Sequence, residues 1–212
     1  MDSLSNDVFF SISAIEFEKV YMVMDKRIAL GYSGRDLSFL LGYRPLYVRD
    51  VEDPRHMLRY TPKDTNYLQL IFDCKLEEIM LPKTVESVYR IRVDTLIREG
   101  DNPIYKISRK LNNNTVVSYR TINLNEDTNG SLLKATVKSE LVLDYIRDLF
   151  EGNYFNEPKT ALEVFNKCKK KLGESVQPCD LACAIAFYTA KRKSPKLNQV
   201  KNKSSRTVYS KG

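Results

Sequence analysis

Two stretches of the sequence hold residues that could contact nucleic acid. In the first, "GYSGRDLSFLLGYRPLYVRDVED" (residues 31–53), a serine precedes a helical pattern, a glycine follows it, and a proline begins a second short pattern. Hydroxyl and guanidinium groups bind phosphate oxygens, whereas side chains on a helix in a groove can reach base edges. We expect phosphate contacts from Ser33 and Arg35. Contacts to base edges are expected from Arg44, Leu46, Tyr47 and Arg49.

The second stretch lies near the end of the sequence, where residues 201–209 read "KNKSSRTVY". Residues 158–212 hold 13 Lys and Arg against 3 Asp and Glu, a net charge of +10, whereas residues 1–157 hold 21 against 24, a net charge of −3. Neutralising phosphates supplies much of the affinity of a protein for nucleic acid. We therefore expect further DNA contacts from Lys201, Lys203 and Arg206. The alternative is that these cations only keep a helical region in solution.

The sequence holds no motif that indicates catalysis or a cofactor. GxxxxGK[ST], GxGxxG, GxSxG and HExxH are all missing from it. Its four cysteines form no CxxC pair and it has a single histidine, so neither a zinc site nor a disulfide framework is indicated. The sequence thus predicts a protein that is not an enzyme and has no cofactor or metal. A rival hypothesis is a nuclease built on central strands, with Asp94 or Glu99 as metal ligands.

The first stretch needs three helices to position its residues. Apolar residues recur at spacings of three and four over 13–31, which predicts an amphipathic helix. Ser33 is a suitable N-cap for a helix over 34–41, and Gly42 permits a tight turn into a third helix over 45–52. Two helices that cross closely after such a turn leave the outer face of the second free to enter a DNA groove. The alternative is that the three helices form a dimerisation or docking module.

This run resembles the lambda-repressor/Cro-like (XRE) helix-turn-helix family, whose usual pattern is Gly-Leu-Ser-Gln-x-x-Leu-Ala-x-x-Leu-Gly-x-Ser-x-x-x-Ile-x-x-Ile-Glu. The resemblance covers residues 16–53, and Arg27 stands where such proteins often carry an arginine. It implies a recognition helix in the major groove. Two departures are Gly34, in place of a glutamine that helps to hold the DNA backbone, and Arg44-Pro45 before the recognition helix. Residues 16–53 also carry a net charge of −1.

The remainder of the chain alternates between helical and β patterns. A partly buried helix or helix pair is predicted over 61–84, ending at Pro82, and a hairpin turn is predicted at the three asparagines 112–114. The predicted strands cover 88–93, 103–111 and 115–124. Further helices are predicted over 139–150, 157–173 and 178–193, and a short strand over 206–209. Three helices followed by a basic run resemble a winged-helix plan, with Lys201, Lys203 and Arg206 on the wing.

Together these patterns predict an α+β fold that is mainly helical, in three segments. The segments are an XRE-like helix-turn-helix domain (1–60), a central helix with a β-hairpin (61–131), and a basic, winged-helix-like C-terminal helical region with a tail (132–212). We predict a transcription regulator that places a recognition helix in the major groove of double-stranded DNA, with supplementary phosphate contacts from the C-terminal region. A homodimer is expected, since one such helix reads only a few base pairs.

The predicted location is the cytoplasm, without membrane association. No apolar run approaches the roughly 20 residues that a membrane-spanning helix needs. The main rival function is a non-enzymatic adaptor, in which the helix-turn-helix binds a protein partner.

Overall fold

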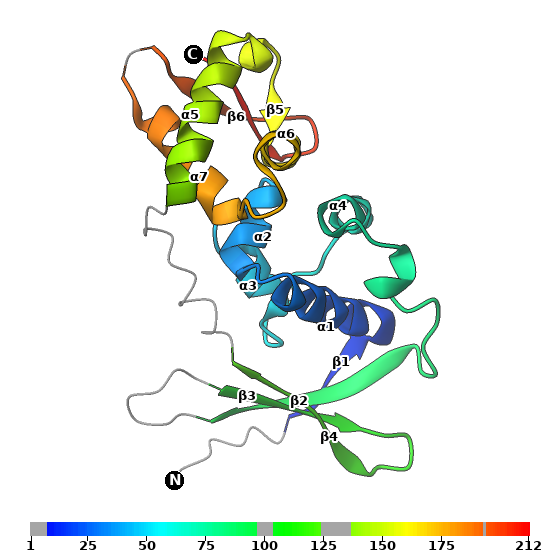
Figure 1. Ribbon diagram of the computed structural model, residues 1–212. Coiled ribbons are helices and arrows are strands. Elements are labelled where there is room, and N and C mark those ends of the chain that lie inside the picture. Colours follow the sequence, from blue (N-terminus) through cyan, green and yellow to red (C-terminus); the bar gives the residue numbers. More distant parts are fainter. Residues whose placement is uncertain (1–7, 97–103, 124–136, 193) are drawn as a thin grey trace. The chain divides into compact units, whose positions relative to one another are not determined.

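The computed structural model describes residues 8–96, 104–123, 137–192 and 194–212 (Figure 1). The described residues form an α+β fold with seven α-helices and two antiparallel sheets, as the sequence predicted for the fold class. The chain divides into two compact units. Unit 1 comprises Met1–Gly31 and Val48–Asn129, and unit 2 comprises Tyr32–Tyr47 and Gly130–Gly212.

Unit 1 contains a four-stranded antiparallel sheet. Its strands lie in the order β1 (Phe10–Ser13), β2 (Val88–Leu96), β3 (Ile104–Lys110) and β4 (Val116–Asn123). The turn between β3 and β4 is closed by a 2.8 Å hydrogen bond from the Leu111 amide to the Thr115 carbonyl oxygen, and Asn114 adopts a positive φ of 66°. The predicted hairpin is therefore confirmed, with asparagine supplying the left-handed residue.

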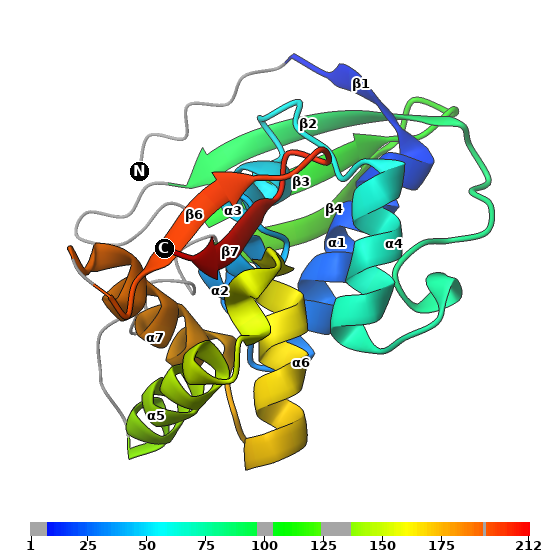
Figure 2. The same ribbon diagram turned by 90° about the horizontal axis from the view of Figure 1, so that it is seen from above.

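One face of this sheet is covered by α1 (Ala14–Ala29), which crosses it in both views (Figures 1 and 2). Phe17 of α1 packs against the rings of Tyr89 and Tyr119, at centroid distances of 6.0 and 5.0 Å. The Glu18 carboxylate accepts hydrogen bonds from the hydroxyls of the same two tyrosines, at 2.9 and 2.6 Å. The predicted first helix is confirmed, and it forms the core of unit 1 together with the sheet.

The remaining helices of unit 1 follow in short succession. They are α3 (Tyr47–Glu52), whose first residue belongs to unit 2, α4 (Pro62–Phe72) and a 3₁₀ turn (Leu76–Glu78). A buried, bidentate ion pair joins Arg27 of α1 to Glu52 of α3, with N–O distances of 2.6 and 2.5 Å. In this fold the pair holds one helix against the other.

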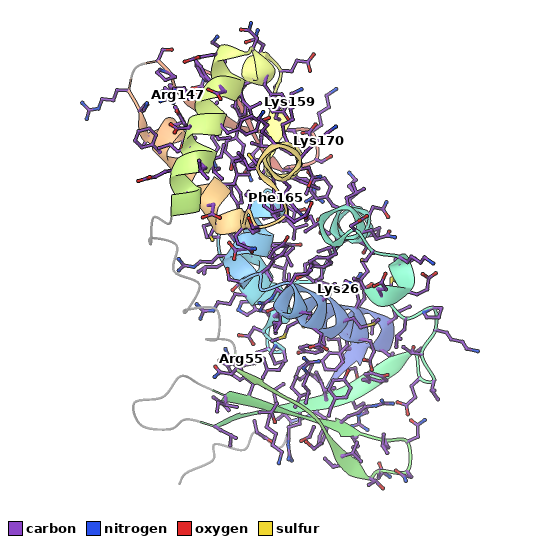
Figure 3. All side chains as sticks on the ribbon, viewed as in Figure 1. Lys26, Arg55, Arg147, Lys159, Phe165 and Lys170 are labelled. Atoms are coloured by element: carbon purple, nitrogen blue, oxygen red, sulfur yellow. The ribbon has the colours of Figure 1, made fainter. Side chains whose placement is uncertain are left out.

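Unit 2 combines four helices with a three-stranded antiparallel sheet of order β5-β7-β6 (Figure 2). Its helices are α2 (Gly34–Leu40), α5 (Val137–Glu151), α6 (Ala161–Leu172) and α7 (Pro178–Ala190), with a 3₁₀ turn at Tyr154–Asn156. Its strands are β5 (Lys159–Thr160), β6 (Leu197–Lys201) and β7 (Thr207–Lys211). α5 and α7 pack side by side, and α2 packs against α6 and α7. Phe165 of α6 contacts the ring of Tyr32, just before α2 (Figure 3).

Two local predictions in unit 2 need correction. The helix predicted over 157–173 begins only at Ala161, because Thr160 accepts a hydrogen bond from the Glu163 amide and so caps the helix. The two preceding residues pair with Tyr209 and Val208 as β5. The predicted strand at 206–209 is confirmed as part of β7, but β6 was missed because its side chains are mostly exposed and carry no strong apolar alternation.

Candidate nucleic-acid interface

The Tyr32–Tyr47 part of the first stretch and the whole of the second stretch belong to unit 2 and contact each other there. We call the residues between β6 and β7, 202–206, the wing loop. The Thr207 amide donates a 2.8 Å hydrogen bond to the carbonyl oxygen of Gly42, in the turn that follows α2. Lys201 Nζ donates to the same carbonyl oxygen at 3.1 Å and to Thr207 Oγ1 at 2.8 Å. The turn after α2 is therefore hydrogen-bonded to the two strand ends that flank the wing loop.

Gly42 is required at this contact by its conformation and by its surroundings. Its φ is +74°, a region that residues with a Cβ rarely adopt. A Cβ at this position would lie 3.0 Å from the Thr207 amide nitrogen and 3.1 Å from the Arg206 Cβ. Glycine thus allows the two backbones to approach closely.

Two of the predicted DNA contacts, Arg206 and Tyr47, are buried beside this turn. Arg206 Nη1 donates a 2.5 Å hydrogen bond to the carbonyl oxygen of Leu41, and its guanidinium carbon lies 5.1 Å from the centroid of the Tyr43 ring. The Tyr43 ring in turn packs against Tyr47, at a centroid distance of 4.1 Å. These side chains hold the turn and the wing loop together, so their main contacts are within the protein.

Most of the other predicted contacts are accessible. Ser33 is half-buried and caps α2: its Oγ accepts from the Asp36 amide at 3.1 Å and donates to Asp36 Oδ2 at 2.7 Å. Arg35 is exposed and has no hydrogen-bond or ion-pair partner among the described residues. The other predicted contacts with exposed side chains are Arg44, Leu46, Lys201 and Lys203 in unit 2, and Arg49 on α3 in unit 1.

Charge is distributed unevenly between the two units. The sequence of unit 2 holds 18 Lys and Arg against 9 Asp and Glu, a net charge of +9, whereas unit 1 holds 16 against 18, a net charge of −2. The residues that extend unit 2 beyond the basic C-terminal region, Tyr32–Tyr47, add two arginines and one aspartate. Unit 2 is therefore the part of the chain whose charge suits a polyanion.

A pocket of about 330 Å³, which the sequence did not reveal, lies in unit 2 beside the Gly42–Thr207 contact. Its lining comes from α2, the turn after α2, α7, and strands β6 and β7. On α7 the lining residues Ala182, Ile185, Ala186 and Thr189 share one face at helical spacing, which is a weak signal in the sequence. Nothing in the sequence indicated that α2 and strands β6 and β7 would enclose this face.

The residues of the rival nuclease hypothesis do not assemble into a site in the described chain. Asp94 is buried on β2 and its Oδ2 lies 3.3 Å from Arg92 Nε, while Glu99 lies outside the described residues. Within residues 8–96, 104–123, 137–192 and 194–212, no three His, Cys, Asp or Glu side chains are grouped so that they could hold a metal ion.

Comparison of the chain with protein-family models, with curated proteins and with solved structures finds no match. None of the described helices combines the length and the apolar character needed to cross a membrane.

Proposed function

We propose that this protein is a transcription regulator that binds double-stranded DNA, and that unit 2 supplies most of its affinity for DNA. The observation that carries this proposal is the contact at Gly42 between the turn after α2 and the basic C-terminal stretch. The hydrogen bond from Thr207 to Gly42 brings the segment with Arg35 and Arg44 and the wing loop with Lys203 into one compact unit of net charge +9.

Phosphate contacts are the role that these side chains suit best. Arg35 and Lys203 are exposed, and neither has a hydrogen-bond or ion-pair partner among the described residues. A guanidinium and an ammonium in this state can neutralise phosphates without first breaking an interaction within the protein. Arg206 has the different role of supporting the wing loop from inside.

The order of elements in unit 2 supports the resemblance to a winged-helix plan. Helix α5 is followed by strand β5, helices α6 and α7, and the β6–β7 hairpin, and β7 lies between β5 and β6 in the sheet. In this plan the hairpin loop carries cations to the DNA backbone, which is the position of Lys203. Lys201, at the end of β6, is exposed but also bonds to Gly42, so it contributes to both the interface and its support.

We propose that base edges are contacted by α3 and by the residues just before it. Leu46 is 37% exposed, and the neighbouring Arg44 and Arg49 are exposed as well. These residues belong to the run that resembles the XRE family, so we propose that α3 acts as its recognition helix. Because α3 has only six residues and can read only a few base pairs, we propose that the protein binds as a homodimer.

The proposal is tested by titrating the full chain into a fluorescent random duplex of about 30 base pairs and measuring anisotropy at 50 and 200 mM salt. Because each neutralised phosphate contributes a slope of about −0.9 in log K against log salt, we expect affinity to fall steeply. Weak binding that does not change with salt would reject the proposal.

An adaptor that binds a protein partner is the second candidate. It is favoured by Phe187, an aromatic side chain on α7 that is 48% exposed, since such side chains are typical anchors of protein interfaces. The anisotropy titration separates the two candidates, because an adaptor has no reason to show salt-sensitive affinity for a duplex.

A further inference from the structure

The pocket in unit 2 has the size and the lining of a ligand site. Its volume of about 330 Å³ lies at the lower end of the roughly 300–1,000 Å³ that is usual for small-molecule sites. Phe39 of α2 and Tyr209 of β7 contribute aromatic rings whose centroids are 6.5 Å apart. Ala182 and Ala186 of α7 add small side chains that leave room above the helix. A flat, apolar group would match this lining.

The polar groups in the lining favour a ligand that carries a negative charge. Arg35 lines the pocket, and its guanidinium has no hydrogen-bond or ion-pair partner among the described residues. The Tyr209 side chain also lines it, and burial raises the pKa of Tyr209 to about 12, so its hydroxyl stays protonated at neutral pH. A guanidinium pairs most strongly with a carboxylate or phosphate, which it can bind with two parallel hydrogen bonds.

Asp36 supplies the one carboxylate in the lining, and this carboxylate does not form an ion pair with Arg35. Asp36 Oδ2 accepts hydrogen bonds from the amide and the Oγ of Ser33, at 3.0 and 2.7 Å, as part of the cap of α2. Its side chain is buried, and no ion pair links it to Arg35. The charge of Arg35 is therefore available to an incoming anion.

We propose that this pocket binds a small aromatic carboxylate, with its rings against Phe39, Tyr209 and the alanines of α7 and its carboxylate on Arg35. A carboxylate is favoured over a phosphate because the lining is mainly apolar and offers a single cationic side chain. This inference does not depend on DNA binding, since the pocket and its charge lie within unit 2 alone.

The test is calorimetric titration of the full chain with benzoate, 2-naphthoate and indole-3-acetate, and with 2-naphthamide as the uncharged analogue. At least one carboxylate is expected to bind with a dissociation constant below about 1 mM, as a ligand of this size in a matching pocket should. For that carboxylate, Arg35→Gln should weaken binding about tenfold or more, because it removes a charge-assisted hydrogen bond. It should leave the weaker binding of 2-naphthamide unchanged.

A second variant tests the location of the site. Ala186→Leu places a larger side chain in the pocket from an exposed helical position, so it should abolish binding of both probe types while circular dichroism confirms the fold. Arg147→Gln, an exposed arginine of α5 outside the pocket, is the matched control and should bind as the wild type does (Figure 3). No binding by any of the three carboxylates, or unchanged binding in Ala186→Leu or in Arg35→Gln, would overturn the proposal.

Discussion

The Thr207 amide is hydrogen-bonded to the carbonyl oxygen of Gly42 across a distance of 2.8 Å, although most of the chain separates the two residues. Lys201 donates to the same oxygen, and Arg206 donates to the neighbouring carbonyl oxygen of Leu41. The turn after α2 and the wing loop are thus fixed to each other by main-chain carbonyl groups. This arrangement places cations from distant parts of the sequence on one unit.

Replacing Gly42 with alanine should destabilise the protein more than the same change at Gly173. Both glycines have a positive φ, so backbone strain should lower the unfolding free energy of each variant by about 1–3 kcal/mol. At Gly173 an added Cβ meets nothing within 4 Å, whereas at Gly42 it would meet the Thr207 backbone at 3.0 Å, adding about 1–3 kcal/mol of overpacking. Urea unfolding followed by circular dichroism measures the difference. Equal losses in the two variants would mean that the close approach to the wing loop is not important for stability.

Removing the buried Arg206 side chain should also lower stability. Arg206→Met leaves the Leu41 carbonyl oxygen without this donor and is expected to cost about 1–3 kcal/mol of unfolding free energy. Lys203→Met, at an exposed position in the same loop, should change stability by less than about 0.5 kcal/mol. If thermal unfolding shows the two variants to be equally stable, Arg206 does not support the loop.

Much of the secondary structure could be predicted because its signals are local. Ser33 caps α2, and the asparagine turn closes the β3–β4 hairpin, as the residue types indicated. The start of α6 was misplaced because β5 exists only through its pairing with β7, almost 50 residues later in the chain. Pairing of this kind depends on the whole fold and leaves little trace in a two-residue strand.

The candidate interface could be predicted in part, for a similar reason. Exposed cations such as Arg35 and Lys203 are visible as charge in the sequence, and their unit carries the excess of positive charge. The burial of Arg206 and Tyr47 could not be anticipated, because it follows from the packing of the wing loop on the turn after α2. The pocket was missed because α2, α7 and the hairpin enclose it only in three dimensions.

Removing one partner of the buried ion pair in unit 1 should lower stability more than removing both charges. Arg27→Met leaves the Glu52 carboxylate buried without its bidentate partner, which is expected to cost about 3–5 kcal/mol. The double variant Arg27→Met with Glu52→Gln removes both charges and should recover a large part of that loss. Chemical denaturation of the single and double variants provides the measurement. A double variant that is no more stable than Arg27→Met would contradict an electrostatic origin of the cost.

An aromatic carboxylate in the pocket should compete with DNA for Arg35. If Arg35 contacts a phosphate in the complex and a carboxylate in the pocket, each ligand weakens binding of the other by the same factor. Anisotropy titrations with saturating 2-naphthoate should therefore show reduced affinity for the duplex in the wild type. Arg35→Gln should abolish this effect. Loss of affinity that persists in this variant would place the competition elsewhere.

The most direct measurement of the central claim compares two double variants that remove the same charge from unit 2. Arg35→Gln with Lys203→Gln removes one cation from α2 and one from the wing loop, whereas Lys170→Gln with Lys171→Gln neutralises exposed lysines at the end of α6 (Figure 3). In duplex titrations at several salt concentrations, the first variant should lose affinity and reduce the salt slope by about 1 to 2. The second variant should retain most of the affinity and most of the salt slope. Equal losses in the two variants, or no loss in the first, would contradict the account.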